Sequence, residues 1–225
     1  MQRVRLTDRL TTRPAAACVM VTGIIAGVLV GGPALGTVAG CGFGSDPYPS
    51  QTAEDWVGHA DHVVVATPLS ERSINRHDYT KGRFLYKVDR NVQLRTESVL
   101  WATRHPRHPI GAAFDLEAPG WRVLRGTGDR FEQTHANAPR LETGHTYLLA
   151  LRWNADQWTV LGEGAAIPYD DQRLGQGEWC GRVLSSEDVA RGERFSRPDD
   201  NSLEETLLGQ NAQVVTRELD QAGTK

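Results

Sequence analysis

The chain has 225 residues, 39% of them hydrophobic, with 25 basic and 28 acidic side chains and a formal net charge of −3. That length accommodates one domain with its own core. A net negative charge is not the footprint of nucleic-acid binding, which would demand a basic face. The composition therefore predicts a solvated domain without a nucleic-acid partner.

Residues 1–40 have the layout of an export signal. Basic side chains come first, an uncharged run covers residues 15–40, and the run ends in small residues. Basic, apolar and small segments in this order are the three parts of a secretory signal, whose basic end stays in the cytoplasm. We predict that residues 1–40 are a signal peptide. After its removal, 21 basic and 27 acidic residues would remain, a net charge of −6.

The last residues before the expected cleavage point are Val38, Ala39 and Gly40, and Cys41 follows them. This sequence resembles the lipobox of bacterial lipoproteins. The resemblance implies a diacylglyceryl group on Cys41, cleavage before it, and a mature protein held by its lipid on the extracytoplasmic side of the cell membrane. The alternative is an uncleaved membrane anchor, because the uncharged run is long enough to span about 30 Å of hydrocarbon.

Two cysteines, Cys41 and Cys180, would remain after the signal peptide has left. A lipid on the Cys41 sulfur excludes a bridge between them. We therefore predict that Cys180 is an unpaired and partly buried thiol. In the alternative, the leader is cut earlier, for example after Ala39, and a secreted protein forms the bridge.

Local sequence patterns predict a linker, a helix and a series of strands over residues 41–169. Residues 41–51, rich in glycine, serine and proline, predict a flexible linker. Thr52 and Asp55 have the spacing of a capping box, which predicts a helix over 52–60. Apolar patterns predict strands at 62–69, 84–88 (with a continuation to 94), 113–117, 122–125, 144–153, 158–161 and 165–169. Polar residues predict loops at 72–81 and 131–140 and a turn at 126–129.

Two further helices are expected near the C-terminus. Ser185 or Ser186 can cap a short helix that runs to Arg191, and Ser202 opens a capping box with a leucine-rich stripe to about residue 220. Strands follow strands without intervening helices, which favours a barrel or sandwich. We predict a mainly β protein with a five- to six-stranded antiparallel OB-like barrel over residues 52–184, a short N-terminal helix, and a C-terminal helical extension over 185–225.

The order of these segments is similar to that of netrin-like OB-fold barrels, the fold of tissue inhibitors of metalloproteinases. The likeness rests on the Trp56 helix leading into Ala60-Asp61, the strand Phe84–Val88, and the glycine-led segment from Gly144 to Leu149. In that family the mature N-terminal cysteine chelates a protease zinc through its α-amino group and carbonyl, and Cys41 is the matching position. A secreted inhibitor with Cys41 free is therefore one alternative function.

Motifs for nucleophilic serine, zinc-protease, phosphate-loop or dinucleotide chemistry do not occur in the sequence. We expect a non-catalytic binding or scaffolding module with no cofactor and no metal, acting on an unknown protein or cell-envelope partner. The alternative enzyme is a carboxylate-dependent hydrolase, with Glu117, Glu163 and Glu178 as candidate acids.

The segment from Trp101 to Ile110 contains two prolines, two histidines and two arginines. Prolines exclude a regular strand interior, and aromatic and arginine side chains carry much of the energy of interfaces. We predict a partner-binding loop with Trp101, Arg104, His105, Arg107 and His108. In the alternative, Trp101 fills one end of the barrel.

Overall fold

The computed structural model describes residues 38–39, 46–135, 138–191 and 203–224, which all belong to one of two compact units, residues 35–225. Most of the predicted signal peptide, together with Gly40 and the proposed lipidation site Cys41, lies outside the described residues.

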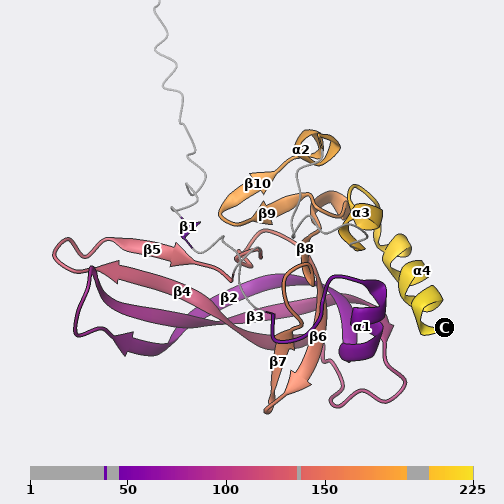
Figure 1. The fold of residues 1–225 in the computed structure, drawn as a ribbon, viewed down its shortest axis with the longest axis horizontal. Helices are drawn as coiled ribbons and strands as arrows, with labels where there is room; N and C mark the ends of the chain where they lie inside the picture. Colours follow the sequence, from indigo (N-terminus) through magenta and orange to yellow (C-terminus); the bar gives the residue numbers. More distant parts are fainter. Residues whose placement is uncertain (1–37, 40–45, 136–137, 192–202, 225) are drawn as a thin grey trace, which may run out of the picture. The chain divides into compact units, whose positions relative to one another are not determined.

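The fold is mainly β, as predicted (Figure 1). The strands are β1 (Val38–Ala39), β2 (His62–Asp78), β3 (Phe84–Ala102), β4 (Ala113–Leu124), β5 (Arg130–Gln133), β6 (Tyr147–Asn154), β7 (Gln157–Val160), β8 (Ala166–Pro168), β9 (Gly177–Trp179) and β10 (Arg182–Leu184). The helices are α1 (Ala53–His59), α2 (Ser186–Ala190), α3 (Leu203–Leu207) and α4 (Ala212–Gly223), with a 3-10 turn, η1, at Asp170–Gln172.

The main sheet has the order β1-β5-β4-β3-β2-β6-β7, with β8 paired to β6. Its pairings are antiparallel except β1 with β5 and β4 with β7, which are parallel. The sheet is therefore mixed, and the expectation of a purely antiparallel sheet was wrong. The path β4-β3-β2-β6-β7 contains five strands of alternating direction. Its first and last members consequently run the same way and meet in parallel, at Leu116 and Trp158.

β2 and β3 are much longer than predicted, and the loop expected at 72–81 is mostly strand. The start of β2 is buried and pairs with both β3 and β6, whereas Ser70–Asp78 pairs with β3 alone and is mostly exposed. Polar side chains on both faces hide this strand from a search for hydrophobic periodicity. Backbone pairing with β3 forms it instead.

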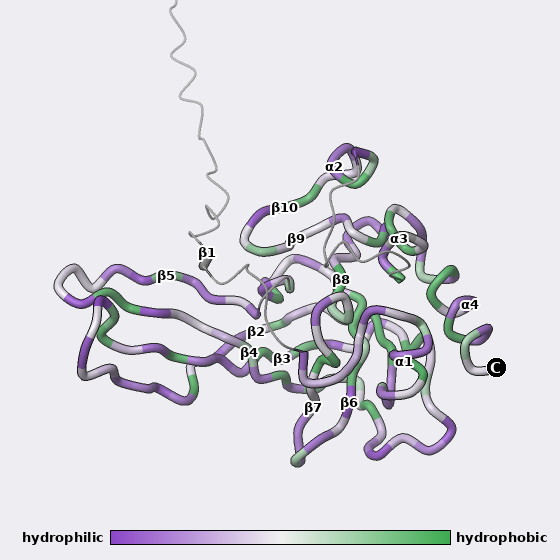
Figure 2. The backbone as a smooth tube through the Cα atoms, in the orientation of Figure 1, coloured by the Kyte–Doolittle hydropathy of each residue, from purple (hydrophilic) through white to green (hydrophobic). Residues whose placement is uncertain are grey.

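We call this extension the arm. It comprises Ser70–Arg90 from β2, β3 and their turn, and Ala118–Gln133 from β4, β5 and their turn. The arm continues the sheet away from the region where β6 and β7 lie (Figure 1). In Figure 2 its strands are mostly hydrophilic, while hydrophobic segments concentrate around β6 and the helices.

The two strands predicted at 113–117 and 122–125 form one strand, β4. A bulge at Gly120 lets the strand continue, because the β3–β4 register shifts between Val88 and Asp89. A Cβ at Gly120 would lie 2.4 Å from the Val88 carbonyl oxygen, so only glycine fits. Residues 131–140 were expected to form a polar surface loop. Instead they include β5 and the fully buried side chain of Arg140.

Two apolar clusters pack on opposite sides of β2 and β6. Val63 and Val65 face a cluster that includes Trp56 of α1 and residues of α3 and α4, while Val64 and Ala66 face a cluster built with β3, β4 and β7. Burial on both faces explains why the sequence of β2 begins with an unbroken β-branched run.

The capping predictions for α1 and α2 are confirmed. Thr52 and Asp55 form a capping box at α1, and Ser185 and Asp188 form one at α2. The single C-terminal helix predicted over 202–220 was wrong, because α3 ends at Leu207 and Gly209 adopts φ 74° before α4 starts. The proposed cap Ser202 lies outside the described residues.

β9 and β10 form a hairpin that the sequence analysis missed. Cys180 and Gly181 make its two-residue turn, with φ of 55° and 77°. Positive φ at both positions defines the type I′ turn that suits tight hairpins. Cys180 is disulfide-bonded, so the prediction of an unpaired thiol was wrong. The other two cysteines, Cys18 and Cys41, lie outside the described residues.

Candidate functional site

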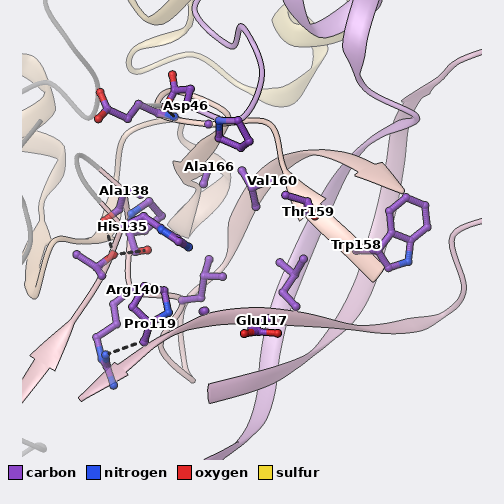
Figure 3. Close-up of a pocket in the computed structure, with 18 of the residues that line it drawn as sticks. Asp46, Glu117, Pro119, His135, Ala138, Arg140, Trp158, Thr159, Val160 and Ala166 are labelled. Carbon is purple, nitrogen blue, oxygen red and sulfur yellow. Dashed lines mark hydrogen bonds between the residues drawn. The ribbon is translucent and has the colours of Figure 1, made fainter. Parts of the chain in front are cut away.

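A cavity of about 370 Å³ opens where β4 meets β7 (Figure 3). Its floor is apolar and comes from the second cluster and its neighbours: Leu116, Ala118, Leu141, Val160 and Ala166. Because β4 and β7 share a single residue pair, they diverge on either side of it and leave this space between them.

Acidic side chains stand at the rim. Asp46 and Glu117 lie at opposite ends of the cavity in Figure 3, with Val160 and Ala166 between them. The Asp46 carboxylate accepts the Glu163 backbone N–H at 2.7 Å, so Glu163 lies at the Asp46 end. Glu117 accepts a hydrogen bond from the Asn75 side chain of β2 at 2.8 Å. The lining therefore includes acids from three separate segments around an apolar floor, and one of them, Glu163, is buried.

Residues 46–50 close the Asp46 end of the cavity. Ser50 is buried and donates to the Asp46 carboxylate at 3.0 Å, and the Tyr48 N–H bonds to the Leu161 carbonyl at 3.1 Å. Gly162 lies directly beneath Asp46, since a Cβ there would come within 2.3 Å of the Asp46 carboxyl carbon. Residues 46–50 of the expected linker thus pack on the body as one wall of the site.

Another wall of the cavity contains His135 and Arg140. Arg140 points its guanidinium away from the apolar floor, donating to the carbonyls of Gly120 at 2.8 Å and Gln133 at 2.6 Å. It also pairs with Glu142 at 2.5 Å, so its charge is neutralised within the wall. Desolvation by the surrounding protein lowers the pKa of the His135 imidazole. The residue is nevertheless exposed to solvent at the cavity mouth.

Behind this wall lies a fully buried carboxyl, Glu178. It accepts the Arg140 backbone N–H at 2.9 Å, the Tyr147 hydroxyl at 2.8 Å and the Gly181 N–H at 3.1 Å. Burial raises the pKa of Glu178 despite these bonds, and burial also raises the pKa of Tyr147. The contacts join the β9–β10 hairpin to the Arg140 segment, which makes Glu178 a structural support.

Of the three carboxylates considered for hydrolysis, Glu117 and Glu163 line the same cavity, whereas Glu178 lies outside its lining. Sequence spacing could not show this, because the two residues are far apart in the chain. The cavity wall at Arg140 was missed for a similar reason: a lone arginine in a polar stretch carries no sign of burial.

A histidine–carboxylate pair lies elsewhere, at the start of β6. Nδ1 of His145 is 2.5 Å from Asp170 Oδ2, and Asp170 Oδ1 accepts the Thr146 N–H at 2.8 Å. The hydrogen bond that His145 donates to Asp170 raises the pKa of His145. Both residues lie outside the lining of the cavity, so the pair is not part of the candidate site.

The predicted partner-binding loop is partly held against the body. Arg107 bonds to the buried Asp61, and the His108 ring stacks on Trp153 with centroids 4.0 Å apart. Trp101 is half-buried at the end of β3 and packs against the first cluster. Arg104, His105, Arg107 and His108 are all exposed despite these contacts.

Within the described ranges, no group of three or more histidine, cysteine or acidic side chains could hold a metal ion. Among the helices of this same part of the chain, none is long and apolar enough to cross a membrane.

The fold and the site together define a mainly β domain with a mixed sheet and a polar-rimmed apolar cavity at the β4–β7 junction. Neither a comparison with models of protein families nor a comparison with curated proteins found a match to this chain.

Proposed function

We propose that this protein is an exported, non-catalytic binding module of the cell envelope that holds a small organic ligand in the cavity between β4 and β7. The observation that carries the proposal is the cavity itself: about 370 Å³, with an apolar floor and an acidic rim. Binding sites for small molecules are concave, mostly apolar and edged by a few polar groups that fix orientation.

The module is, in this proposal, an OB-like barrel. Support comes from the strand path β4-β3-β2-β6-β7, whose ends return to each other through Leu116 and Trp158. A partly open Greek-key barrel of five strands also leaves few strand edges unpaired. Such barrels host many unrelated functions. In this proposal the barrel determines where the ligand binds, and the side chains that line the cavity determine which ligand it is.

The lining predicts the ligand's chemistry. Asp46 and Glu117 make the two ends of the cavity acidic, and the charge of the one arginine in the wall is neutralised by Glu142. An apolar body with a cationic or hydrogen-bond-donating group would match the floor and the rim at once. An anionic ligand would meet carboxylates at both ends of the cavity.

The experiment is calorimetric titration of the purified protein with benzyltrimethylammonium and, as the matched anion, phenylacetate. We expect the cation alone to bind, and Thr159→Phe, which fills the cavity from β7, to abolish binding. Thr127→Phe on the exposed β4–β5 turn is the control and should leave binding unchanged. Equal binding of the anion, or full binding by Thr159→Phe, would contradict the proposal.

A second candidate function is carboxylate-dependent hydrolysis, favoured by the placement of Glu117 and Glu163 in one cavity. It requires both acids, so turnover of nitrophenyl glycosides would have to be lost in Glu117→Gln and in Glu163→Gln alike. The binding proposal expects no turnover in the unmodified protein.

Export is supported by the leader-like residues 1–40 and by the disulfide at Cys180, since such bonds persist in oxidising compartments. The state of Cys41 distinguishes a lipid-anchored protein from a secreted one. A lipid on Cys41 and a Cys41–Cys180 bridge are mutually exclusive, and Cys41 is the one other cysteine of a mature chain that has lost residues 1–40. The disulfide at Cys180 thus favours the secreted alternative over the lipid anchor.

Mass spectrometry of the mature N-terminus distinguishes the two forms. A lipid adduct on Cys41 supports the anchor, and an unmodified Cys41 supports secretion. Only the unmodified form leaves Cys41 available for the inhibitor alternative. That alternative expects inhibition of a zinc protease by the mature protein, and loss of inhibition when the N-terminus is extended by one residue.

A further inference from the structure

The tip of the arm has a charge opposite to that of the whole chain. Residues 72–87 and 121–130 contain eight basic and two acidic side chains, a net charge of +6 in a protein whose formal net charge is −3. The basic residues are Arg72, Arg76, Lys81, Arg83, Lys87, Arg122, Arg125 and Arg130, and most of them are exposed. The rest of the chain is correspondingly acidic.

Aromatic rings lie between these cations. The Arg76 guanidinium covers Tyr86 at 3.8 Å, and Arg130 covers Trp121 at 4.2 Å. Arg83 covers Phe84 at 4.6 Å. These stacked pairs hold the guanidinium groups over the sheet surface, where the Arg76 group also pairs with Asp78 at 2.8 Å.

Hydrogen bonds join the two hairpins of the tip. Arg125, between β4 and β5, donates to the carbonyls of Tyr79 at 2.6 Å and Phe84 at 3.2 Å in the β2–β3 hairpin. Its backbone N–H bonds to the Arg83 carbonyl at 2.8 Å. The two hairpins therefore form one unit, and their cations are presented together. Leu85, an exposed apolar residue, lies on the same unit.

We propose that the arm tip docks on the headgroup surface of an anionic phospholipid bilayer. A patch of limited size suits end-on contact with a plane, which keeps the acidic remainder of the protein away from the lipid phosphates. A long polyanion would instead run along that acidic remainder and be repelled. Aromatic and arginine side chains favour the interface between headgroups and hydrocarbon, where apolar bodies are buried and polar ends remain hydrated.

This inference does not depend on the ligand cavity, which the exposed residues of the tip do not line. It also differs from attachment through Cys41, because it uses the folded sheet and predicts a dependence on lipid charge. A lipid anchor would insert into neutral and anionic bilayers alike.

The test is cosedimentation of the purified protein with vesicles. Vesicles of phosphatidylglycerol and phosphatidylcholine are compared with vesicles of phosphatidylcholine alone. We expect binding to the anionic vesicles to exceed binding to the neutral ones, and to fall as the salt concentration rises from about 50 to about 300 mM.

The tip variant Arg76→Glu/Lys81→Glu/Arg83→Glu should lose roughly tenfold or more of the anionic binding, since each basic residue adds attraction near such a surface. The control Arg173→Glu/Arg191→Glu/Arg217→Glu makes the same change of charge at exposed sites outside the arm and should bind normally. The milder variant Lys81→Gln/Arg83→Gln, checked by circular dichroism, covers the case in which the triple variant does not fold.

Three outcomes would overturn the proposal. The tip variants could bind anionic vesicles as well as the unmodified protein does. Soluble polyphosphate could compete the protein off the vesicles and itself bind the tip as tightly. A salt-sensitive dimer in sedimentation velocity, lost in the tip variants, would assign the tip to a second copy of the chain.

Discussion

Asp61, which directly precedes β2, accepts two hydrogen bonds from Arg107. Oδ1 of the fully buried Asp61 accepts both the backbone N–H and the guanidinium Nη1 of Arg107, each at 3.0 Å. Its Oδ2 accepts the Trp153 N–H at 2.8 Å. One carboxylate thus fastens the loop after β3 to the end of β6.

Replacing Asp61 by Asn should destabilise the protein by about 1–3 kcal/mol, because a buried donor loses its charged acceptor. Burial acts to raise the pKa of Asp61, but the bonds from Arg107 and Trp153 outweigh it and lower the pKa. A lowered pKa gives stability that is present above the unfolded value of about 3.9 and lost as the pH falls through the folded value. Urea unfolding at several pH values should show the deficit of Asp61→Asn at neutral pH and its disappearance in acid. Asp129→Asn, in an exposed turn, is the control.

Glu178 should show the opposite pH dependence. Its raised pKa means that the folded state binds the proton more tightly than the unfolded chain does. This contribution to stability is complete below the unfolded pKa and is lost as the pH rises through the folded pKa. We expect Glu178→Gln to gain stability relative to the unmodified protein as the pH rises above the unfolded glutamate value of about 4.3. Thermal melts at intervals of pH measure this, with the exposed Glu187→Gln as control. A pH-independent difference would contradict the expectation.

The His145–Asp170 pair predicts a third pH effect. Since Asp170 raises the pKa of His145, the pair stabilises the fold below the unfolded histidine value of about 6.5 and stops doing so as the pH passes the folded value. Asp170→Asn should lower the pKa of His145 in an NMR titration of its ring proton and should cost most stability in mild acid. Asp171→Asn, whose carboxylate bonds to the Gln176 side chain, should leave that titration unchanged.

The disulfide at Cys180 predicts a large stability effect. Cys180→Ser should lower the free energy of unfolding by roughly 2–5 kcal/mol, as expected for a native bridge in a single domain. Thiol titration of the denatured mature protein should detect no free thiol until a reductant is added. Cys41→Ser should then expose one thiol, if Cys41 is the partner. A free thiol in the unreduced, unmodified protein would restore the lipid proposal.

Gly120 should tolerate no side chain. Gly120→Ala would drive a methyl group into the Val88 carbonyl oxygen and should cost about 1–3 kcal/mol by displacing the β3–β4 bulge. The control, Gly58→Ala, is in α1 with open space around it and should stabilise the helix by up to about 1 kcal/mol. Urea unfolding of both variants tests the pair; equal effects would mean that the close approach at Gly120 does not matter.

Local chemistry alone determined several features of this protein. Thr52 caps α1 as its spacing to Asp55 predicts, and Ser185, one of the two serines expected to cap the next helix, caps α2, because a capping box needs only four consecutive residues. The start of β2 followed from a β-branched run that suits burial on both faces. The leader-like composition of residues 1–40 likewise needs no tertiary structure to be recognised.

Tertiary structure decided the rest. The arm exists because β2 and β3 pair far beyond the buried core, through backbone groups that carry no sequence signature. The cavity needs Asp46, Glu117 and Glu163 from three distant segments, and the burial of Arg140 depends on carbonyls of β4 and β5. Cys180 could be assigned to a hairpin turn only once β9 and β10 had paired. In each case the deciding interaction joins residues far apart in the chain, so the periodicity and spacing of neighbouring residues could not reveal it.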